Sequence, residues 1–195
     1  RAFLGHLASE LKVSAGTHDQ ALSALLFLYK EVLGVELPWL TELERPKKPK
    51  RLPVVLGHGE VERLLSALEG THALMGQLLY GTGMRLMECV RLRVKDVEFE
   101  RREIVVREGK GGKDRVTMLP ASLAPLLRAH LVRVRQLWER DREAGQPGVY
   151  MPEALVRKYP AAPCEWGWFW VSPARCLSVD PRSGIERRHH THEQA

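Results

Sequence analysis

Apolar residues recur at intervals of three and four along much of the chain, which is the spacing of an amphipathic helix. The pattern predicts helices over 18–33, 61–70, 72–80 and 123–144, and a further helix that begins near Arg85. Two of these helices, the one that begins near Arg85 and the one over 123–144, have apolar positions that we expect to face a core. These positions are Leu86, Cys89, Val90, Leu92, Leu123, Leu126, Leu127, Leu131, Val134, Leu137 and Trp138.

Residues 96–119 change to a period of two, with apolar and polar positions in alternation. This alternation predicts short antiparallel strands joined by turns at 100–102 and 109–112. The predicted fold is therefore mainly α with a small antiparallel β-sheet (α+β).

A basic, proline-containing segment divides the chain. Residues 45–51 read Arg-Pro-Lys-Lys-Pro-Lys-Arg, and both the prolines and the repelling charges oppose a helix. We predict a partial helical domain over 1–44, a linker over 45–57 and a larger domain over 58–195. One interpretation is a solvated linker only. The other is a linker that also follows a phosphate backbone, through Lys47, Lys48, Lys50 and Arg51.

Composition narrows the class of protein. The 195 residues are 44% hydrophobic with a net charge of +6, which excludes a wholly disordered chain and weakly favours an anionic partner. The three cysteines are scattered and odd in number, which argues against a disulfide scaffold and favours a reducing, cytoplasmic setting. No segment has the length of a membrane span or the features of a signal peptide.

The chain begins with Arg and ends in what looks like the start of a helix, so we expect a piece of a longer protein.

The first candidate for chemistry is the run Gly81-Thr82-Gly83-Met84-Arg85-Leu86-Met87-Glu88. The glycines allow a tight bend, and an arginine at the start of the next helix suits a phosphate. Glu88 falls on the same helix face and is placed to orient Arg85. The simpler interpretation is a surface arginine paired with Glu88.

The second candidate is the turn Gly109-Lys110-Gly111-Gly112-Lys113 between two predicted strands. A lysine at a hairpin tip can bind a phosphate or act as a general acid, and the alternative is an ordinary solvated turn. The spacing of a nucleotide-binding P-loop is absent.

The stretch 149–183 is irregular and carries a cluster of aromatic residues, Trp166, Trp168, Phe169 and Trp170. This cluster is either a local core under a long loop or a surface on which bases stack. Histidines follow at 189, 190 and 192, but their spacing does not match a zinc site, so we predict no metal.

Together, the segment Leu78–Pro120 resembles the core of a tyrosine site-specific recombinase. The resemblance implies that Arg85 contacts the scissile phosphate and that Lys110 is the acid for the leaving 5′ oxygen. It also implies that the first helices belong to a core-binding domain of the SAM-like type.

Residues 149–192 are further similar to the added segment of integron integrases. That resemblance implies recognition of folded single-stranded DNA sites through protruding bases, contacted by Trp168, Pro181, His189 and His190. It implies integration and excision of gene cassettes by a tetramer on DNA through a 3′-phosphotyrosine, with no cofactor and no membrane partner.

We assign neither the family's His-x-x-Arg pair nor its tyrosine nucleophile to residues of this sequence, so we expect the chain by itself to bind DNA at most. Two alternatives stay open: a non-catalytic DNA-binding remnant, and a phage-type recombinase that acts on double-stranded sites.

Overall fold

The computed structural model describes residues 2–35, 54–107, 109 and 111–193. The chain forms two compact units, Arg1–Val55 and Leu56–Ala195. Most of the predicted linker, including Lys47, Lys48, Lys50 and Arg51, lies outside the described residues.

The first unit is a pair of helices, α1 (Ala2–Ser9) and α2 (Ala15–Phe27), followed by a wide helical turn η1 (Leu28–Val32). Ser14 caps α2 by accepting a hydrogen bond from the Thr17 backbone N–H at 3.2 Å. Leu4 and Leu22 are buried between the helices, whereas Phe3 and Phe27 remain exposed. The predicted helix over 18–33 thus begins earlier and changes pitch near its end.

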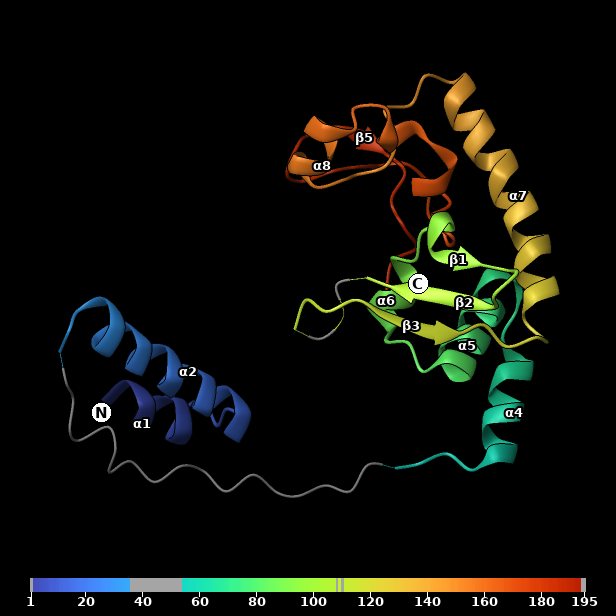
Figure 1. Ribbon diagram of the computed structural model, residues 1–195. Coiled ribbons are helices and arrows are strands. Elements are labelled where there is room, and N and C mark those ends of the chain that lie inside the picture. The colour runs from blue at the N-terminus through green and yellow to red at the C-terminus, as the bar shows by residue number, and fades with distance from the viewer. Residues whose placement is uncertain (1, 36–53, 108, 110, 194–195) are drawn as a thin grey trace. The chain divides into compact units, whose positions relative to one another are not determined.

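The second unit begins with α4 (His58–Ala67), α5 (Gly70–Thr82), α6 (Leu86–Val90) and a single 3₁₀ turn, η2 (Val94–Asp96) (Figure 1). The bend between α5 and α6 occurs at Gly83, whose φ of 65° places it in the left-handed region that favours glycine. This bend determines the position of Arg85, the residue that caps the start of α6.

The strands β1 (Val97–Glu98), β2 (Glu103–Val106) and β3 (Arg115–Met118) form an antiparallel sheet in that order. Ile104 pairs with Val97 on one side and with Thr117 on the other. The side chains of Ile104 and Val106 are buried on the inner face. The predicted α+β fold class is confirmed.

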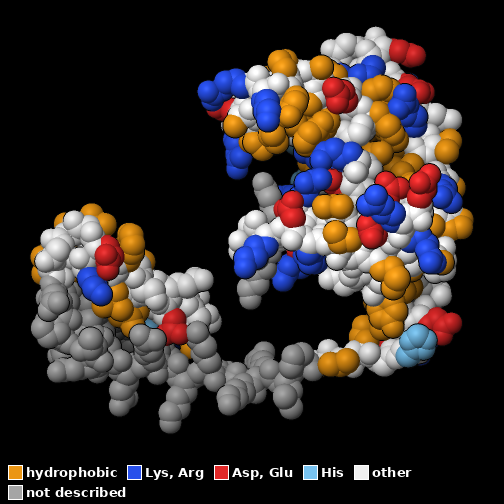
Figure 2. Space-filling model, viewed as in Figure 1, with side chains coloured by type: hydrophobic (Ala, Val, Ile, Leu, Met, Phe, Trp, Pro, Cys, Tyr) orange, Lys and Arg blue, Asp and Glu red, His pale blue; other side chains and the backbone are white. Residues whose placement is uncertain are grey.

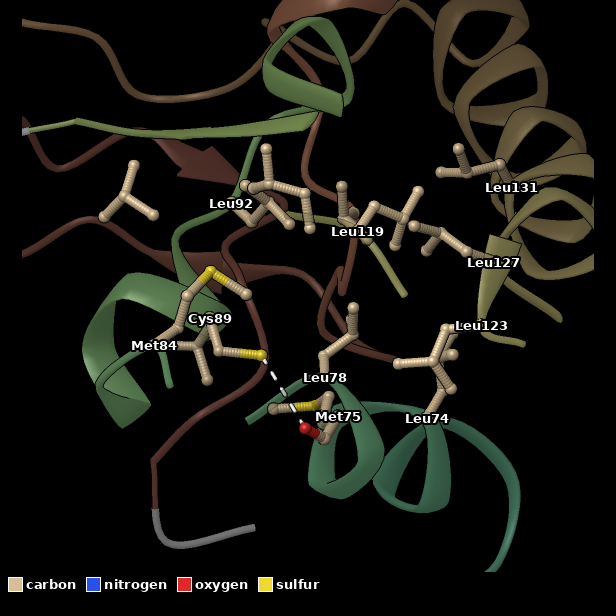
Figure 3. Close-up of a cluster of buried hydrophobic side chains, with 14 of the residues drawn as sticks. Leu74, Met75, Leu78, Met84, Cys89, Leu92, Leu119, Leu123, Leu127 and Leu131 are labelled. Atoms are coloured by element: carbon tan, nitrogen blue, oxygen red, sulfur yellow. Dashed lines mark hydrogen bonds between the residues drawn. The ribbon is translucent and has the colours of Figure 1, made fainter. Parts of the chain in front are cut away.

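The long helix α7 (Ala124–Glu143) packs across α5 and contributes to the main core. Figure 3 shows Met75 of α5 beside Cys89 of α6, in a cluster that also includes Leu78 of α5 and Leu127 of α7. Cys89 Sγ lies 4.0 Å from the Met75 carbonyl oxygen, and burial raises the pKa of this thiol to about 11.

Two predicted core positions are wrong. Leu86 and Leu126 are 43% and 51% exposed, respectively. Leu86 opens a helix of only five residues, and Leu126 lies beside the buried stripe of α7 rather than within it. Apolar spacing alone assigned both to the core, but each lies on the solvent side of its helix.

The segment that follows α7 folds with few regular elements, which are α8 (Glu153–Lys158), η3 (Ala162–Cys164), η4 (Trp166–Trp168), β4 (Ser178–Val179) and β5 (Glu186–Arg187). We call residues 149–192, the range of the predicted insertion, the insertion segment. It has its own buried cluster, in which Val149, Met151, Phe169 and Trp170 pack against Val134 of α7. Within the described residues, no helix has the length and apolarity required to cross a bilayer.

Candidate nucleic-acid interface

Arg85 lies at the start of α6 and points a half-exposed guanidinium group into solvent. Its backbone N–H donates to Glu88 Oε2 at 2.8 Å, and its Nη1 donates to Glu88 Oε1 at 2.8 Å. The predicted contact between Arg85 and Glu88 is therefore confirmed. The Arg85 side chain is still 58% exposed, so part of its donor fork faces outward.

Glu88 also holds a second arginine, Arg115, at the beginning of β3. Arg115 Nη1 and Nη2 donate to the two carboxylate oxygens of Glu88 at 2.8 and 2.7 Å. The hydrogen bond from Arg115 is the largest of the effects that lower the pKa of Glu88 to about 2, against the opposing effect of burial. The carboxylate is therefore ionised at neutral pH and neutralises part of the charge of two arginines.

The hairpin between β2 and β3 is closed by short backbone hydrogen bonds. The Gly109 N–H donates to the Lys113 carbonyl at 3.0 Å, and the Gly112 N–H donates to the Gly109 carbonyl at 2.9 Å. Lys113 is exposed, as a phosphate-binding lysine must be. Lys110, the predicted acid, lies outside the described residues.

A buried aspartate supports the other strand of this hairpin. Asp96 Oδ1 accepts from Arg107 Nε at 2.7 Å and from Lys95 Nζ at 3.3 Å. Arg107 also pairs with Asp114 at 3.4 Å. Both strands are thus tied to the body of the unit by arginine–carboxylate contacts.

The insertion segment places Trp168 beside a cation. Lys95 Nζ lies 4.0 Å from the centroid of the half-buried Trp168 ring. Arg93 Nη1 donates to the Trp168 carbonyl at 2.7 Å, and its guanidinium carbon lies 3.2 Å from the centroid of the Trp170 ring. Pro181, the other apolar base-contacting candidate, is exposed.

The two candidate histidines are partly buried and follow β5. The His190 ring meets Trp170 edge to face at 5.1 Å, and its Nδ1 lies 2.8 Å from the Thr191 carbonyl oxygen. Burial lowers the pKa of His190, with smaller contributions in the same direction from Arg91, His189 and Arg93. His190 is therefore linked to Trp168 by two intermediate residues. Trp170 contacts the His190 ring, and Arg93 contacts both Trp170 and the Trp168 carbonyl.

The aromatic cluster is partly a local core, which was the first of the two interpretations of the sequence. Phe169 and Trp170 are buried, and Trp166 packs against both Trp138 and Phe169 at 5.9 and 6.2 Å between ring centroids. Trp168 is only half-buried. Within the described ranges, no group of three or more His, Cys, Asp or Glu side chains is arranged to hold a metal ion.

Three arginines that organise this surface were not indicated by the sequence pattern. Arg93, Arg107 and Arg115 are ordinary members of a basic chain, and only the fold brings them to Trp170, Asp96 and Glu88. The available signal for Arg115 was its place at the first position of a strand directly after the glycine-rich turn. Figure 2 shows Lys and Arg side chains around the hollow between the insertion segment and the β2–β3 hairpin.

Comparisons with known proteins place these features in a family. Residues 55–146 match the phage integrase family, and residues 1–39 match the phage integrase N-terminal SAM-like domain. The chain is therefore similar to phage integrase domains over these two stretches.

Several individual proteins are similar to the chain in sequence or in structure. An integrase/recombinase of Escherichia coli is 57% identical over 193 residues, which cover 99% of this chain and 57% of the relative. Tyrosine recombinase XerA of Thermococcus onnurineus strain NA1 is 45% identical over 93 residues, 46% of this chain and 33% of the relative. A crystal structure of XerA recombinase matches with a TM-score of 0.39 and 28% identity over 68% of this chain and 48% of that one. The chain thus spans little more than half the length of the relatives that match it throughout.

Proposed function

We propose that this chain supplies the DNA-binding surface and part of the catalytic set of a site-specific DNA recombinase. The observation that carries the proposal is Arg85, a half-exposed guanidinium held by a nearly buried carboxylate at the base of a glycine-rich hairpin. A guanidinium presented in this way is suited to a phosphodiester, because its planar fork matches two phosphate oxygens. The match to the phage integrase family over residues 55–146 supports this role for Arg85.

In the reaction of the complete protein, a tyrosine hydroxyl attacks the phosphodiester, and the bond from phosphorus to the 5′ oxygen breaks. The products are a 3′-phosphotyrosine and a DNA end with a free 5′ hydroxyl. Arg85 stabilises the charge that develops on the phosphate, and Lys110 donates a proton to the leaving 5′ oxygen. Attack by another 5′ hydroxyl reverses the step, so neither ATP nor a metal is consumed.

Within this chain, Arg85 and Lys110 are the members of that catalytic set that we assign. The tyrosines are Tyr29, Tyr80, Tyr150 and Tyr159, and we assign the nucleophile to none of them. We therefore propose that the chain by itself binds DNA without cleaving it, and that the complete protein acts as a tetramer in the cytoplasm.

The insertion segment supports a more specific proposal, recombination of integron gene cassettes at folded single-stranded sites. The family match ends at residue 146, directly before the insertion segment, whereas the similarity to the Escherichia coli relative includes nearly the whole chain. Trp168, Pro181, His189 and His190 are the residues proposed to contact protruding bases. A flat, half-buried indole such as Trp168 offers a stacking surface that does not depend on base identity.

The test compares binding of the chain to two fluorescent DNA hairpins of the same stem, one perfectly paired and one with protruding bases. We expect Arg85→Gln to weaken binding to both and to lower the slope of log binding constant against log salt by about one. The control is Arg101→Gln, which removes the same charge from the exposed turn between β1 and β2. An Arg85→Gln variant that binds both hairpins as the unchanged chain does would overturn the proposal.

The same assay separates the more specific alternatives. We expect Trp168→Ala to weaken binding to the bulged hairpin and to leave the paired hairpin unaffected. Equal affinity of the unchanged chain for both hairpins favours a phage-type recombinase that acts on double-stranded sites. Binding without covalent capture of a suicide substrate by the complete gene product favours a non-catalytic remnant.

A further inference from the structure

The two strands of the β2–β3 hairpin are each anchored by an arginine on a nearly buried carboxylate. Arg107 follows β2 and binds Asp96, whose side chain is 4% exposed. Arg115 opens β3 and binds Glu88, whose side chain is 8% exposed. Since the carboxylates belong to η2 and α6, respectively, the hairpin is anchored to two different elements of the body.

Glu88 differs from Asp96 because it is shared with the candidate phosphate-binding residue. Oε1 accepts from both Arg85 Nη1 and Arg115 Nη1 at 2.8 Å, and Oε2 accepts from the Arg85 backbone N–H at 2.8 Å and from Arg115 Nη2 at 2.7 Å. One carboxylate therefore fixes the start of α6, the Arg85 guanidinium and the first residue of β3. A displacement of Arg115 changes the hydrogen-bond partners that orient Arg85.

The packing around this carboxylate leaves little freedom. A Cβ atom at Gly109 would lie 2.8 Å from the Lys113 carbonyl oxygen, 3.2 Å from Arg115 Nη1 and 3.6 Å from Glu88 Oε1. The hairpin backbone is thus in close contact with the Arg115–Glu88 pair.

We infer that Arg115 is a positioning residue: through Glu88 it couples Arg85 to the first residue of β3, so that the β2–β3 hairpin fixes the orientation in which Arg85 meets a phosphodiester. The inference rests on the proposed function for its consequence in DNA binding. The coupling itself is a property of the chain without DNA. Arg115 needs both terminal nitrogens for this role, because it holds the two oxygens of Glu88 at once.

The experiment combines DNA binding with a spectroscopic readout on Arg85. Arg115→Gln removes the two hydrogen bonds, Arg115→Lys keeps the charge but not the planar fork, and Arg101→Gln is the control for loss of charge. We expect Arg115→Gln to weaken binding to a DNA duplex by about tenfold, with Arg115→Lys nearly as weak and Arg101→Gln close to the unchanged chain. In an Arg85→Gln background, the further change Arg115→Gln should have little effect, because the coupled residue is already absent.

The NMR signal of the Arg85 Nε–H group tests the coupling without DNA. We expect it to shift in Arg115→Gln and in Arg115→Lys, and to stay in place in Arg101→Gln. Far-UV circular dichroism of each variant shows that its helices are retained, and if Arg115→Gln does not fold, the charge-conserving Arg115→Lys variant decides the question. An unchanged Arg85 signal, or additive losses in the double variant, would overturn the inference. If Arg85→Gln leaves DNA binding intact, the proposed function fails, while the NMR result still decides the coupling.

Discussion

Two arginine–carboxylate pairs in the second unit have hydrogen bonds of nearly the same length but differ in how far they are exposed to solvent. Arg115 binds Glu88 through two hydrogen bonds of 2.7 and 2.8 Å, and Arg188 binds Asp141 through two of 2.6 and 2.7 Å. The Arg188 side chain is 9% exposed, whereas that of Arg115 is 37% exposed. The first pair lies at the surface beside Arg85, and the second is buried between α7 and the end of the insertion segment.

The difference also concerns the remaining donors of each guanidinium. Arg188 Nη1 donates to the carbonyls of Ala174 and Arg175 at 2.9 and 2.8 Å, so each of its nitrogens has an acceptor. The Arg188 carbonyl in turn accepts from Trp170 Nε1 at 3.3 Å. A buried arginine whose three nitrogens each have an acceptor within the protein stabilises the fold. An exposed one with donors directed at solvent, such as Arg85, is available to a ligand.

The largest effect that follows from this comparison is on stability at Arg188. Arg188→Met leaves Asp141 as a buried carboxylate without its partner, and we expect a loss of about 3–5 kcal/mol in the free energy of unfolding. Equilibrium urea unfolding measures the loss. The matched control is Arg182→Met, which removes an exposed arginine of the same segment and should cost far less. Adding Asp141→Asn to Arg188→Met should restore part of the stability, and a loss equal to that of Arg182→Met would contradict the buried-pair interpretation.

The next largest effect is the loss of stability when a glycine that packs against backbone atoms is replaced by alanine. A Cβ atom at Gly148 would lie 2.5 Å from the Pro163 carbonyl oxygen, and Gly148 has a φ of 85°. Gly148→Ala therefore combines a backbone collision with a strained conformation, and we expect it to destabilise the chain by about 3 kcal/mol. Gly109→Ala meets a comparable contact without the positive φ and should cost less. Gly59→Ala in α4, where a Cβ meets open space, is the control, and equal losses in all of these variants would contradict the prediction.

A smaller effect concerns pH and Glu88. The pKa of this carboxyl is about 2 in the folded chain against its usual 4.5, so Glu88 binds a proton less readily in the folded state than in the unfolded one. Its contribution to stability is therefore fully present above pH 4.5 and is lost as the pH falls toward 2. Unfolding free energies measured across this range should fall less steeply for Glu88→Gln than for the unchanged chain. A pH dependence identical in Glu88→Gln would contradict the prediction, and Glu62→Gln on the exposed side of α4 is the control.

The parts of the fold that the sequence predicts are those with local causes. Alternating residues such as Ile104 and Val106 indicated the strands. The contact between Arg85 and Glu88 was predicted from their spacing of three residues, although Arg85 is the N-cap of α6 and Glu88 reaches back to it from the first turn. Leu86 and Leu126 were assigned to the core in error, because spacing reports a stripe but not which of its edges meets another element.

The long-range contacts were not predictable for a physical reason. Arg188 and Asp141 are 47 positions apart, and nothing local distinguishes Arg188 from its neighbour Arg187. The same holds for Arg115, which reaches Glu88 across 27 positions only because the bend at Gly83 and the sheet bring α6 and β3 together. The roles proposed for Lys110, Trp168 and His189 depend on DNA contacts and remain predictions.

The smallest effect is on stability at Arg135, an arginine whose exposure exceeds that of the buried Arg188. Arg135 lies over the rings of Trp138 and Trp166, with its guanidinium carbon at 4.2 and 5.1 Å from the ring centroids, and it pairs with Glu139 at 2.9 Å. Because its side chain is 42% exposed, we expect Arg135→Met to cost only about 0.5–1 kcal/mol, mostly through the lost cation–π contacts. Glu139→Gln removes the ion pair alone and should cost less than about 0.5 kcal/mol. Urea unfolding of both variants decides whether the stabilisation by an arginine follows its burial. A loss in Arg135→Met as large as that in Arg188→Met would show that it does not, since the two arginines differ mainly in exposure and in the number of acceptors.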